Sequence, residues 1–407
     1  MDEKTPMTSL PYGRQWITEE DIQAVVEVLR SGWITQGPRI EAFEEILAKE
    51  VEAKEAVVCS SGTAALHLMA LSLEMGDEDV VIVPSLTFLA TANAARFTGT
   101  RVIFCDIDSK TFNLDLNHLE SLMKKLKGKK KVVIPVHFAG LPCPMETVGE
   151  LAERYGWLVL EDGCHALGAT YPTRSGKSHK VGKGCHSLMT AFSFHPVKAI
   201  TTGEGGAVTT NDPKIAARLR RLRNHGTLRD PSAFQFPHMG IEAGKPNPWY
   251  YEMVELGFNY RMTDIQAALG ISQIKRLPFF IHRRETISNR YRHAFESHPY
   301  LTFQEIPPGY RSAWHLFVIL IAFEDIGKSR RQVMEELRAL GILTQVHYLP
   351  LHLHPYYRHL LGTGENDLPG AESYYRKALS IPLFPAMTDE DVERVIQAIY
   401  KVIKPVG

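Results

Sequence analysis

The stretch AFSFHPVKAITTGEGGAVTT, residues 191–210, places Lys198 between an apolar strand-like run and three glycines that cluster around Glu204. Burial disfavours the charged form of a lysine, so a lysine at the end of a buried strand needs a reason. The sequence on both sides of this stretch predicts the fold in which Lys198 lies. It also indicates what the amine does there.

Seven short β-branched runs alternate with helical stretches between residues 56 and 212. They read AVVCSS, VVIVPS, RVIFCDI, KVVIPVHF, WLVLEDG, TAFSFH and GAVTTN, and the last two flank Lys198. Runs this continuously apolar are buried on both faces, and helices between them connect parallel strands. The pattern predicts an α/β domain built on a mainly parallel, seven-stranded sheet.

The sequence divides into an N-terminal arm, residues 1–13, a large domain, residues 14–270, and a smaller C-terminal α/β domain, residues 271–407. In the large domain, Thr18 and Asp21 form a capping pair before an amphipathic helix with apolar residues at helical spacing. In the small domain, HLFVILIAF and TQVHYLP are strand-like, and SRRQVMEELRALGI is helical. YPTRSGKSHKVGKG and FPHMGIEAGKPNPWYY are expected to be surface loops or hairpins.

Composition excludes several classes of function. Lysine plus arginine and aspartate plus glutamate number 46 each, so no net charge attracts nucleic acid or an anionic membrane. The five cysteines have no paired spacing, and His347, His352 and His354 match no metal-ligand pattern, so we expect no metal site. The N-terminus has neither a signal peptide nor a transmembrane pattern, and we expect a cytoplasmic protein.

Ligands of open α/β sheets bind at the carboxyl ends of the strands, and three motifs lie there. The turn of residues 60–63 precedes a helix and suits a phosphate, although a simple serine cap is equally compatible. Asp162 follows another strand and could cap a helix or pair with a ring nitrogen. Lys198 could be a surface lysine or an imine-forming amine. Together they are the parts that a pyridoxal phosphate site requires.

These motifs resemble those of a known family. SSGTAALHL, PSLTFLATANA, EDGCHALGA, FSFHPVKAITTGEGGAVTTND, LRNHG and LGFNYRMTDIQAALG occur in the order found in the DegT/DnrJ/EryC1/StrS sugar-nucleotide aminotransferases. The resemblance runs from about residue 11 to residue 406. It implies a fold type I, aspartate aminotransferase-like enzyme that depends on pyridoxal 5′-phosphate.

The resemblance implies a role for each matching residue. Lys198 matches the lysine that forms a Schiff base with the cofactor and shuttles protons, and Asp162 matches the residue that binds the pyridine nitrogen. The remaining cofactor-binding matches are Gly62, Thr63 and Ser193 at the phosphate, Phe88 on the ring face, His165 beside the phenolic oxygen, and Asn259, which reaches the phosphate from the neighbouring subunit. The last match implies a homodimer with its active site at the subunit interface.

Within the family, the sequence looks most like the aminotransferases of pseudaminic acid biosynthesis. The resemblance implies L-glutamate as the amino donor and C4 of a UDP-linked 2-acetamido-2,6-dideoxy-4-keto-L-hexose as the acceptor. Substrate-facing matches are Thr35, Gln36, Gly37, His347 and Tyr348, and Arg14, Arg223 and Arg261 are candidates for the diphosphate.

Other functions stay open at this point. The acceptor could be a UDP-linked D-sugar of the bacillosamine or legionaminic acid route, or an eight-carbon keto-sugar acid. A non-catalytic, cofactor-binding regulator is a further alternative. Residues 172–184 form a longer and more basic segment than the resemblance leads us to expect, which is either a neutral surface hairpin or a local change near the nucleotide.

Overall fold

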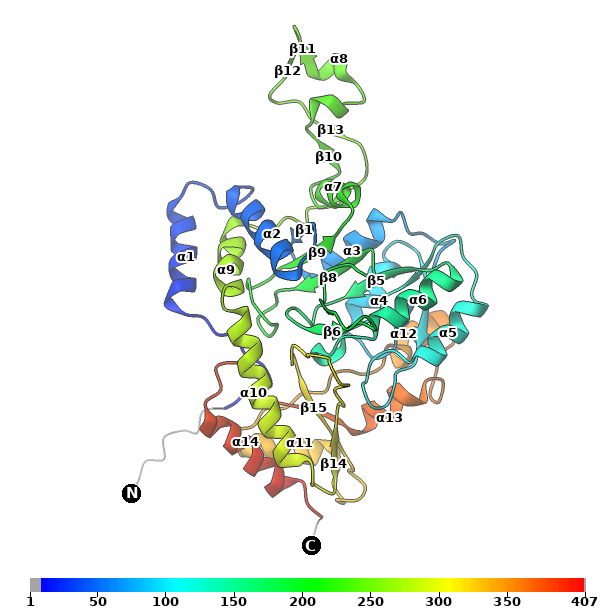
Figure 1. Cartoon of the computed structure of the whole chain (residues 1–407), viewed down its shortest axis with the longest axis vertical. Coiled ribbons are helices and arrows are strands. Elements are labelled where there is room, and N and C mark those ends of the chain that lie inside the picture. Colours follow the sequence, from blue (N-terminus) through cyan, green and yellow to red (C-terminus); the bar gives the residue numbers. More distant parts are fainter. Residues whose placement is uncertain (1–8, 406–407) are drawn as a thin grey trace.

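The central sheet of the computed structural model, which describes residues 9–405, has seven strands (Figure 1). In spatial order they are β1 (Glu55–Cys59), β9 (Gly206–Thr210), β8 (Met189–Ser193), β5 (Leu158–Asp162), β4 (Lys131–Val133), β2 (Val80–Pro84) and β3 (Arg101–Cys105). Only β9 runs antiparallel to its neighbours, and the other pairs are parallel. The predicted α/β fold with a mainly parallel, seven-stranded sheet is confirmed.

Both faces of this sheet are buried because alternate residues of each strand join different apolar clusters. In β2, Val81 and Val83 pack into a cluster with α3 and α4, whereas Val80 and Ile82 pack into a second cluster with helices of the opposite face. The helices of the large part are α2 (Pro38–Val51), α3 (Gly62–Ser72), α4 (Leu89–Arg96), α5 (Leu116–Lys125), α6 (Met145–Tyr155), α7 (Pro213–Leu222) and α9 (Asp264–Ile274). Two-sided burial explains why the strands are so continuously apolar in sequence.

The C-terminal part has its own three-stranded antiparallel sheet of β14 (Leu301–Phe303), β15 (Phe317–Ile321) and β16 (Ala378–Ile381). It packs with α11 (Arg330–Ala339) and α14 (Asp389–Val402), while α12 (Pro355–Leu361) and α13 (Pro369–Lys377) lie closer to the large sheet. The helix α10 (Leu277–Phe295) begins in a core cluster of the large part and ends in that of the small part. The predicted boundary near residue 270 stays a prediction.

Among the described helices, none has the length and apolar character that a membrane span needs.

The strand expected in TQVHYLP is wrong. Within this segment only Gln345 forms a β-bridge, with Ser380 of β16, and the residues after Gln345 have no strand pairing. The backbone pairing ends after Gln345, but His347 Nδ1 still lies 2.8 Å from Ser380 Oγ of β16. Tyr348 then reaches the large part, where its Oη lies 3.3 Å from His165 Nε2.

Helix α1 (Glu19–Arg30) has the predicted capping box of Thr18 and Asp21. Its apolar residues are less buried than an amphipathic helix leads one to expect, since Ile22 and Leu29 are 48% and 58% exposed. The helix is held on α9 by a polar contact instead, in which Gln273 Nε2 donates to Asp21 Oδ2 at 2.6 Å. An apolar side of α1 is therefore left uncovered in the single chain.

Two segments expected to be surface hairpins are hairpins. Strands β6 (Thr170–Pro172) and β7 (Ser178–Lys180) pair antiparallel, as do β11 (Ile241–Glu242) and β12 (Lys245–Pro246). The second hairpin, with α8 (Pro237–Gly240), forms the tip of an arm that projects from the body of the molecule (Figure 1). The base of this arm is the two-stranded pair β10 (Thr227–Leu228) and β13 (Glu252–Met253).

We predict that Gly270→Ala destabilises the protein although alanine is the better helix former by about 1 kcal/mol. A Cβ at Gly270 of α9 would lie 2.5 Å from Cζ of the fully buried Phe43 of α2, and such overpacking costs about 1–3 kcal/mol. The urea midpoint followed by far-UV circular dichroism should fall. Adding Phe43→Leu should recover part of the loss, and a midpoint that rises in Gly270→Ala alone would contradict this packing.

Candidate active site

A cavity of about 590 Å³ opens at the carboxyl ends of β5 and β8 and at the N-terminus of α3. Most of the predicted site residues line this one cavity, although they are distant in sequence: Gly62, Thr63, Phe88, Asp162, His165, Ser193, Lys198, His347 and Tyr348. The parallel arrangement of β5 and β8 brings Asp162 and Ser193 to the same edge of the sheet.

Asp162 is the last residue of β5 and is 4% exposed. Its carboxylate accepts two hydrogen bonds, from Thr91 Oγ1 to Oδ2 at 2.7 Å and from the Cys164 backbone N–H to Oδ1 at 3.1 Å. Thr91 lies in the first turn of α4 and is itself bonded to Thr87 Oγ1 at 2.7 Å. These contacts hold the carboxylate in one orientation at the wall of the cavity.

Lys198 lies in the loop that follows β8. Its backbone N–H donates to the carbonyl of His195 at 2.8 Å, and its carbonyl accepts from Arg284 Nη2 at 3.5 Å. Burial lowers the pKa of the Lys198 amine below its ordinary value, while Cys164 and the carboxylate of Asp162 oppose that shift. A lowered pKa increases the fraction of neutral amine, which is the nucleophilic form.

The turn of residues 60–63 forms a corner for an anion. The Ser61 side chain accepts a hydrogen bond from the Ala64 N–H at 3.1 Å. This serine is therefore a helix cap, which was one of the two alternatives for the turn. The N–H groups of Gly62 and Thr63 belong to the first turn of α3, where the helix offers them no carbonyl. A Cβ on Gly62 would lie 2.8 Å from Ser193 Cβ, so glycine is needed for α3 to begin against β8. The amides and the hydroxyls of Thr63 and Ser193 border the same cavity.

The opposite wall of the cavity consists of imidazole and phenol groups. Tyr348 Oη lies 3.3 Å from His165 Nε2, and the ring of His165 lies 4.2 Å from that of His315, centroid to centroid. Burial, with the charge of Lys198, lowers the pKa of His165 well below its usual range and that of His347 to about 3. At neutral pH these imidazoles are uncharged. They serve as hydrogen-bonding groups and add no positive charge.

Four predicted residues lie away from this cavity. Thr35 bridges to Thr263, and the Gly37 N–H donates to Asp264 Oδ2 at 2.7 Å, so the exposed segment of Thr35, Gln36 and Gly37 is fixed to the start of α9. Asn259 is exposed beside Asn224. None of the four lines the cavity of its own chain. Their roles stay predictions.

The diphosphate candidates also separate. Arg223 is engaged in the body of the protein, where its Nη1 donates to Glu44 Oε1 and to the carbonyl of Val58. Arg261 donates to Asn224 Oδ1 at 2.7 Å, and Arg14 is exposed near Lys198. Arg223 is therefore the least suited of the three to bind a ligand.

The basic segment of residues 172–184 is a surface hairpin whose cations are paired with nearby acids. Arg174 contacts Glu150 of α6, Lys180 lies 3.1 Å from Glu50 of α2, and Lys183 lies 2.7 Å from Glu52. The residues that border the cavity include none from this hairpin. Its charge is thus balanced locally, away from Lys198.

Several cavity residues were missed from the sequence. Tyr12, His195, Glu204 and His315 border the cavity, and Thr91 orients Asp162. His315 in AWHLF carries a weak signal, since it is a histidine at the start of an apolar strand. Thr91 and Tyr12 carry none, because their roles depend on which distant segments pack beside them.

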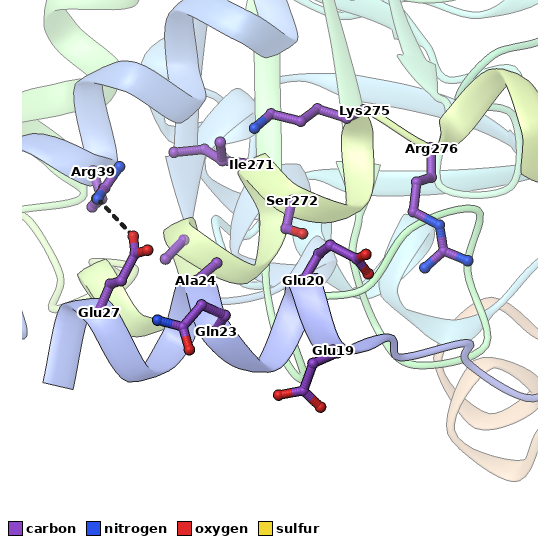
Figure 2. Close-up of a pocket in the computed structure, with 11 residues that line it drawn as sticks. Glu19, Glu20, Gln23, Ala24, Glu27, Arg39, Ile271, Ser272, Lys275 and Arg276 are labelled. Carbon is purple, nitrogen blue, oxygen red and sulfur yellow. Dashed lines mark ion pairs between the residues drawn. The ribbon is translucent and has the colours of Figure 1, made fainter.

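A second cavity, of about 580 Å³, lies between α1, α2 and α9 (Figure 2). Figure 2 shows acidic side chains of α1 on one side and Lys275 and Arg276, which follow α9, on the other. Glu27 is paired to Arg39 of α2 at 3.8 Å. The cofactor-binding and catalytic residues predicted above do not border it. Over residues 9–405, no cluster of three or more His, Cys, Asp or Glu side chains is placed to hold a metal ion.

An α/β fold that brings a half-buried lysine and a buried aspartate to one cavity is typical of enzymes that act on substrates through an amine. Within it, the chain belongs to the DegT/DnrJ/EryC1/StrS aminotransferase family, which residues 15–400 match. The protein is thus an aminotransferase, and the resemblance inferred from its motifs is confirmed.

Three relatives show how far the similarity extends. The spore coat polysaccharide biosynthesis protein SpsC of Bacillus subtilis is 40% identical, with 97% of each chain covered. The UDP-4-amino-4-deoxy-L-arabinose–oxoglutarate aminotransferase of Shewanella sediminis is 37% identical over 97% of this chain and 98% of its own. The solved structure of Helicobacter pylori PseC, an aminotransferase involved in pseudaminic acid biosynthesis, is 32% identical with a TM-score of 0.86, and covers 97% of this chain and 99% of its own.

We predict that an amine-selective reagent modifies Lys198 at half of its maximal rate at a pH below about 10.4, the ordinary pKa of lysine. Asp162→Asn should lower this pH further, because the carboxylate favours the charged ammonium. Peptide mass spectrometry across a pH series measures both, with the exposed Lys275 as internal reference. A higher half-maximal pH in Asp162→Asn would contradict the electrostatics described here.

Proposed function

We propose that this sugar aminotransferase moves an amino group from L-glutamate to C4 of a UDP-linked 2-acetamido-2,6-dideoxy-4-keto-L-hexose, the step that belongs to pseudaminic acid biosynthesis. The observation that carries the proposal is the meeting of Lys198, Asp162 and the α3 corner at one cavity in a member of this aminotransferase family. The substrate is the finer part of the proposal, and it rests on relatives and on the residues facing the cavity.

The cofactor is pyridoxal 5′-phosphate, as throughout this family. The residues present fit it. The amides and hydroxyls around Gly62, Thr63 and Ser193 suit a phosphate ester, and the volume of about 590 Å³ holds a cofactor beside a substrate. The buried carboxylate of Asp162 suits a protonated ring nitrogen. When bound, the cofactor supplies the electron-accepting ring and carries the amino group between donor and acceptor.

This chain's own residues then have distinct tasks. Nζ of Lys198 holds the cofactor and, once released, takes up and returns the proton of the substrate carbon, which its lowered pKa favours. Asp162 keeps the ring nitrogen protonated, and Thr91 holds that carboxylate in place. Neutral His165 and Tyr348 offer hydrogen bonds without repelling the ammonium group of the donor, and Phe88, which borders the cavity, would cover a ring face.

The proposed substrates draw on the names of the relatives. PseC supports a 4-keto-L-sugar of the pseudaminic acid route, and the Shewanella relative supports a UDP-linked acceptor and glutamate, the amino form of oxoglutarate. That relative also favours a second candidate acceptor, a UDP-linked 4-keto-pentose. The two acceptors differ at C2, where the hexose carries an acetamido group and the pentose a hydroxyl, and at C5, where the hexose carries a methyl group that the pentose lacks.

We further propose a homodimer in which Asn259 of each subunit reaches the other subunit's cavity. The support is an exposed, apolar surface around this residue, since Leu256 is 75% and Met253 64% exposed, and large exposed patches mark association sites. The uncovered apolar side of α1 is a further exposed surface. The free thiols Cys59, Cys105 and Cys143, all buried, agree with a reducing cytoplasmic location.

The test of the proposal is three parallel reactions, each with the protein and L-glutamate. One contains the 4-keto-L-hexose, one its D-configured counterpart and one the 4-keto-pentose, all UDP-linked. Proton NMR should show that the product of the L-hexose reaction carries an amine at C4. The kcat/KM for the L-hexose should exceed the kcat/KM for each of the other two sugars. Lys198→Arg keeps the charge but should lower kcat at least about a thousandfold. Turnover of only the D-sugar or the pentose would overturn the assigned substrate.

Mixed subunits test the shared site. We expect Lys198→Ala and Asn259→Ala to be nearly inactive alone, and co-expression in equal amounts to restore about one quarter of wild-type activity. Half of the dimers would be mixed, and one of the two sites in each would be intact. Native mass spectrometry checks that mixed dimers form. Mixed dimers without restored activity would contradict the placement of Asn259 in the partner's site.

A further inference from the structure

Three buried side chains outside the cavity form a serine–histidine–carboxylate chain. Ser85 Oγ lies 2.7 Å from His352 Nδ1, and His352 Nε2 lies 3.2 Å from Glu372 Oε1. This order of groups is that of a hydrolytic triad. Ser85 and His352 are 0% exposed, however, and neither borders the cavity of Lys198. The serine cannot reach a substrate, so the chain needs another explanation.

The hydrogen bonds of this chain run in one direction. Burial alone would raise the pKa of Glu372, but bonds from the backbone and from His352 outweigh it and lower that pKa. Burial lowers the pKa of His352, so the ring is neutral and has one donor and one acceptor nitrogen. An ionised carboxylate only accepts hydrogen bonds, so the His352 Nε2–H donates to Glu372. His352 Nδ1 then accepts a hydrogen bond from the Ser85 hydroxyl. Ser85 Oγ in turn accepts from the His352 backbone N–H at 3.3 Å.

The chain joins two segments that border the cavity to a third that lies behind them. Ser85 follows β2 and precedes Thr87 and Phe88, which border the cavity. His352 ends the segment of residues 347–352, whose first two residues border the cavity from the other side. A backbone bond from the Leu351 N–H to the Ser85 carbonyl, at 2.8 Å, reinforces the same junction.

The third segment is α13, which carries Glu372. Two residues further on, Tyr374 Oη donates to the carbonyl of His347 at 2.7 Å, so α13 fixes both ends of the segment of residues 347–352. Between these two anchors, Tyr348 reaches His165 and its ring lies 5.9 Å from that of Phe88. The position of Tyr348 therefore depends on anchors that themselves never touch the cavity.

We propose that Ser85, His352 and Glu372 are positioning residues that hold the segment of residues 347–352 over the cavity and thereby set the affinity for the sugar acceptor. This inference rests on the proposed function, because it takes that segment to face the sugar. The phosphate and the ring nitrogen of the cofactor would be held on other segments, at the α3 corner and at Asp162, although Phe88 and His165 lie against Tyr348. Loosening the chain should therefore weaken sugar binding more than cofactor binding.

The test compares Ser85→Ala, Glu372→Ala and the conservative Glu372→Gln. A displacement of about 1 Å can cost up to about a hundredfold, so we expect KM for the sugar to rise about tenfold in the two alanine variants. The kcat and the dissociation constant of pyridoxal phosphate should stay within about threefold. Glu372→Gln keeps an acceptor for His352 Nε2–H and should restore most of the sugar affinity.

Ser187→Ala is the matched control. Ser187 donates to Glu161, which also accepts from His137 Nε2 at 2.8 Å, so it belongs to a second buried chain of the same three residue types that does not contact residues 347–352. This variant should lose stability without a change in sugar KM. A sugar KM that stays at the wild-type value in folded Ser85→Ala, or that rises equally in Ser187→Ala, would overturn the positioning role.

Amide hydrogen exchange gives a readout that needs no substrate. The amides of residues 347–352 should exchange faster in Ser85→Ala than in Ser187→Ala, and unchanged exchange would overturn the inference. Should Glu372→Ala fail to fold, Ser85→Ala decides, since it removes a single hydroxyl. Wild-type protein that turns over none of the keto-sugars refutes the proposed function, whereas turnover with an unaltered KM in the variants refutes the positioning role alone.

Discussion

The site depends on one constraint of the sheet, which is that β5 and β8 run parallel as neighbours. Asp162 ends the first of these strands, and Ser193 ends the second, five residues before Lys198. A carboxylate, a phosphate-binding hydroxyl and an amine are thereby delivered to one edge of the sheet. The antiparallel β9 then returns beside β8, and its first residue, Gly206, leaves room for the turn before α3, because a Cβ there would lie 2.3 Å from the carbonyl oxygen of Ser61.

Burial at this edge lowers the pKa of Lys198 and of the surrounding imidazoles. The imidazoles are therefore neutral beside the carboxylate of Asp162, and the fraction of neutral Lys198 amine is increased. Such an environment favours an amine that attacks and exchanges protons over one that forms a permanent ion pair. Outside the cavity, buried chains such as Ser85–His352–Glu372 satisfy their own hydrogen bonds and connect segments rather than react.

The sequence was informative where function follows directly from a strand end. Asp162, Ser193 and the turn at Gly62 come immediately after apolar runs, so the sheet alone brings them together. Thr91 and Tyr12 could not be predicted, because they meet the site only through the packing of α4 and of the segment before α1. The strand expected at TQVHYLP failed for a related reason, since that segment leaves the small sheet after Gln345 to bond across the cavity. Helix α1 was predicted, but the exposure of Ile22 and Leu29 on its apolar side was not.

The most direct measurement is the absorption spectrum of the purified protein loaded with pyridoxal phosphate, recorded before and after L-glutamate and again after the UDP-linked 4-keto-L-hexose, with Lys198→Ala alongside. The account predicts a visible band that glutamate removes and the sugar restores, and that is altered from the start in the variant. A band that glutamate removes but the sugar does not restore would contradict the assigned acceptor. Failure of the wild-type protein to bind the cofactor at all would contradict the account as a whole.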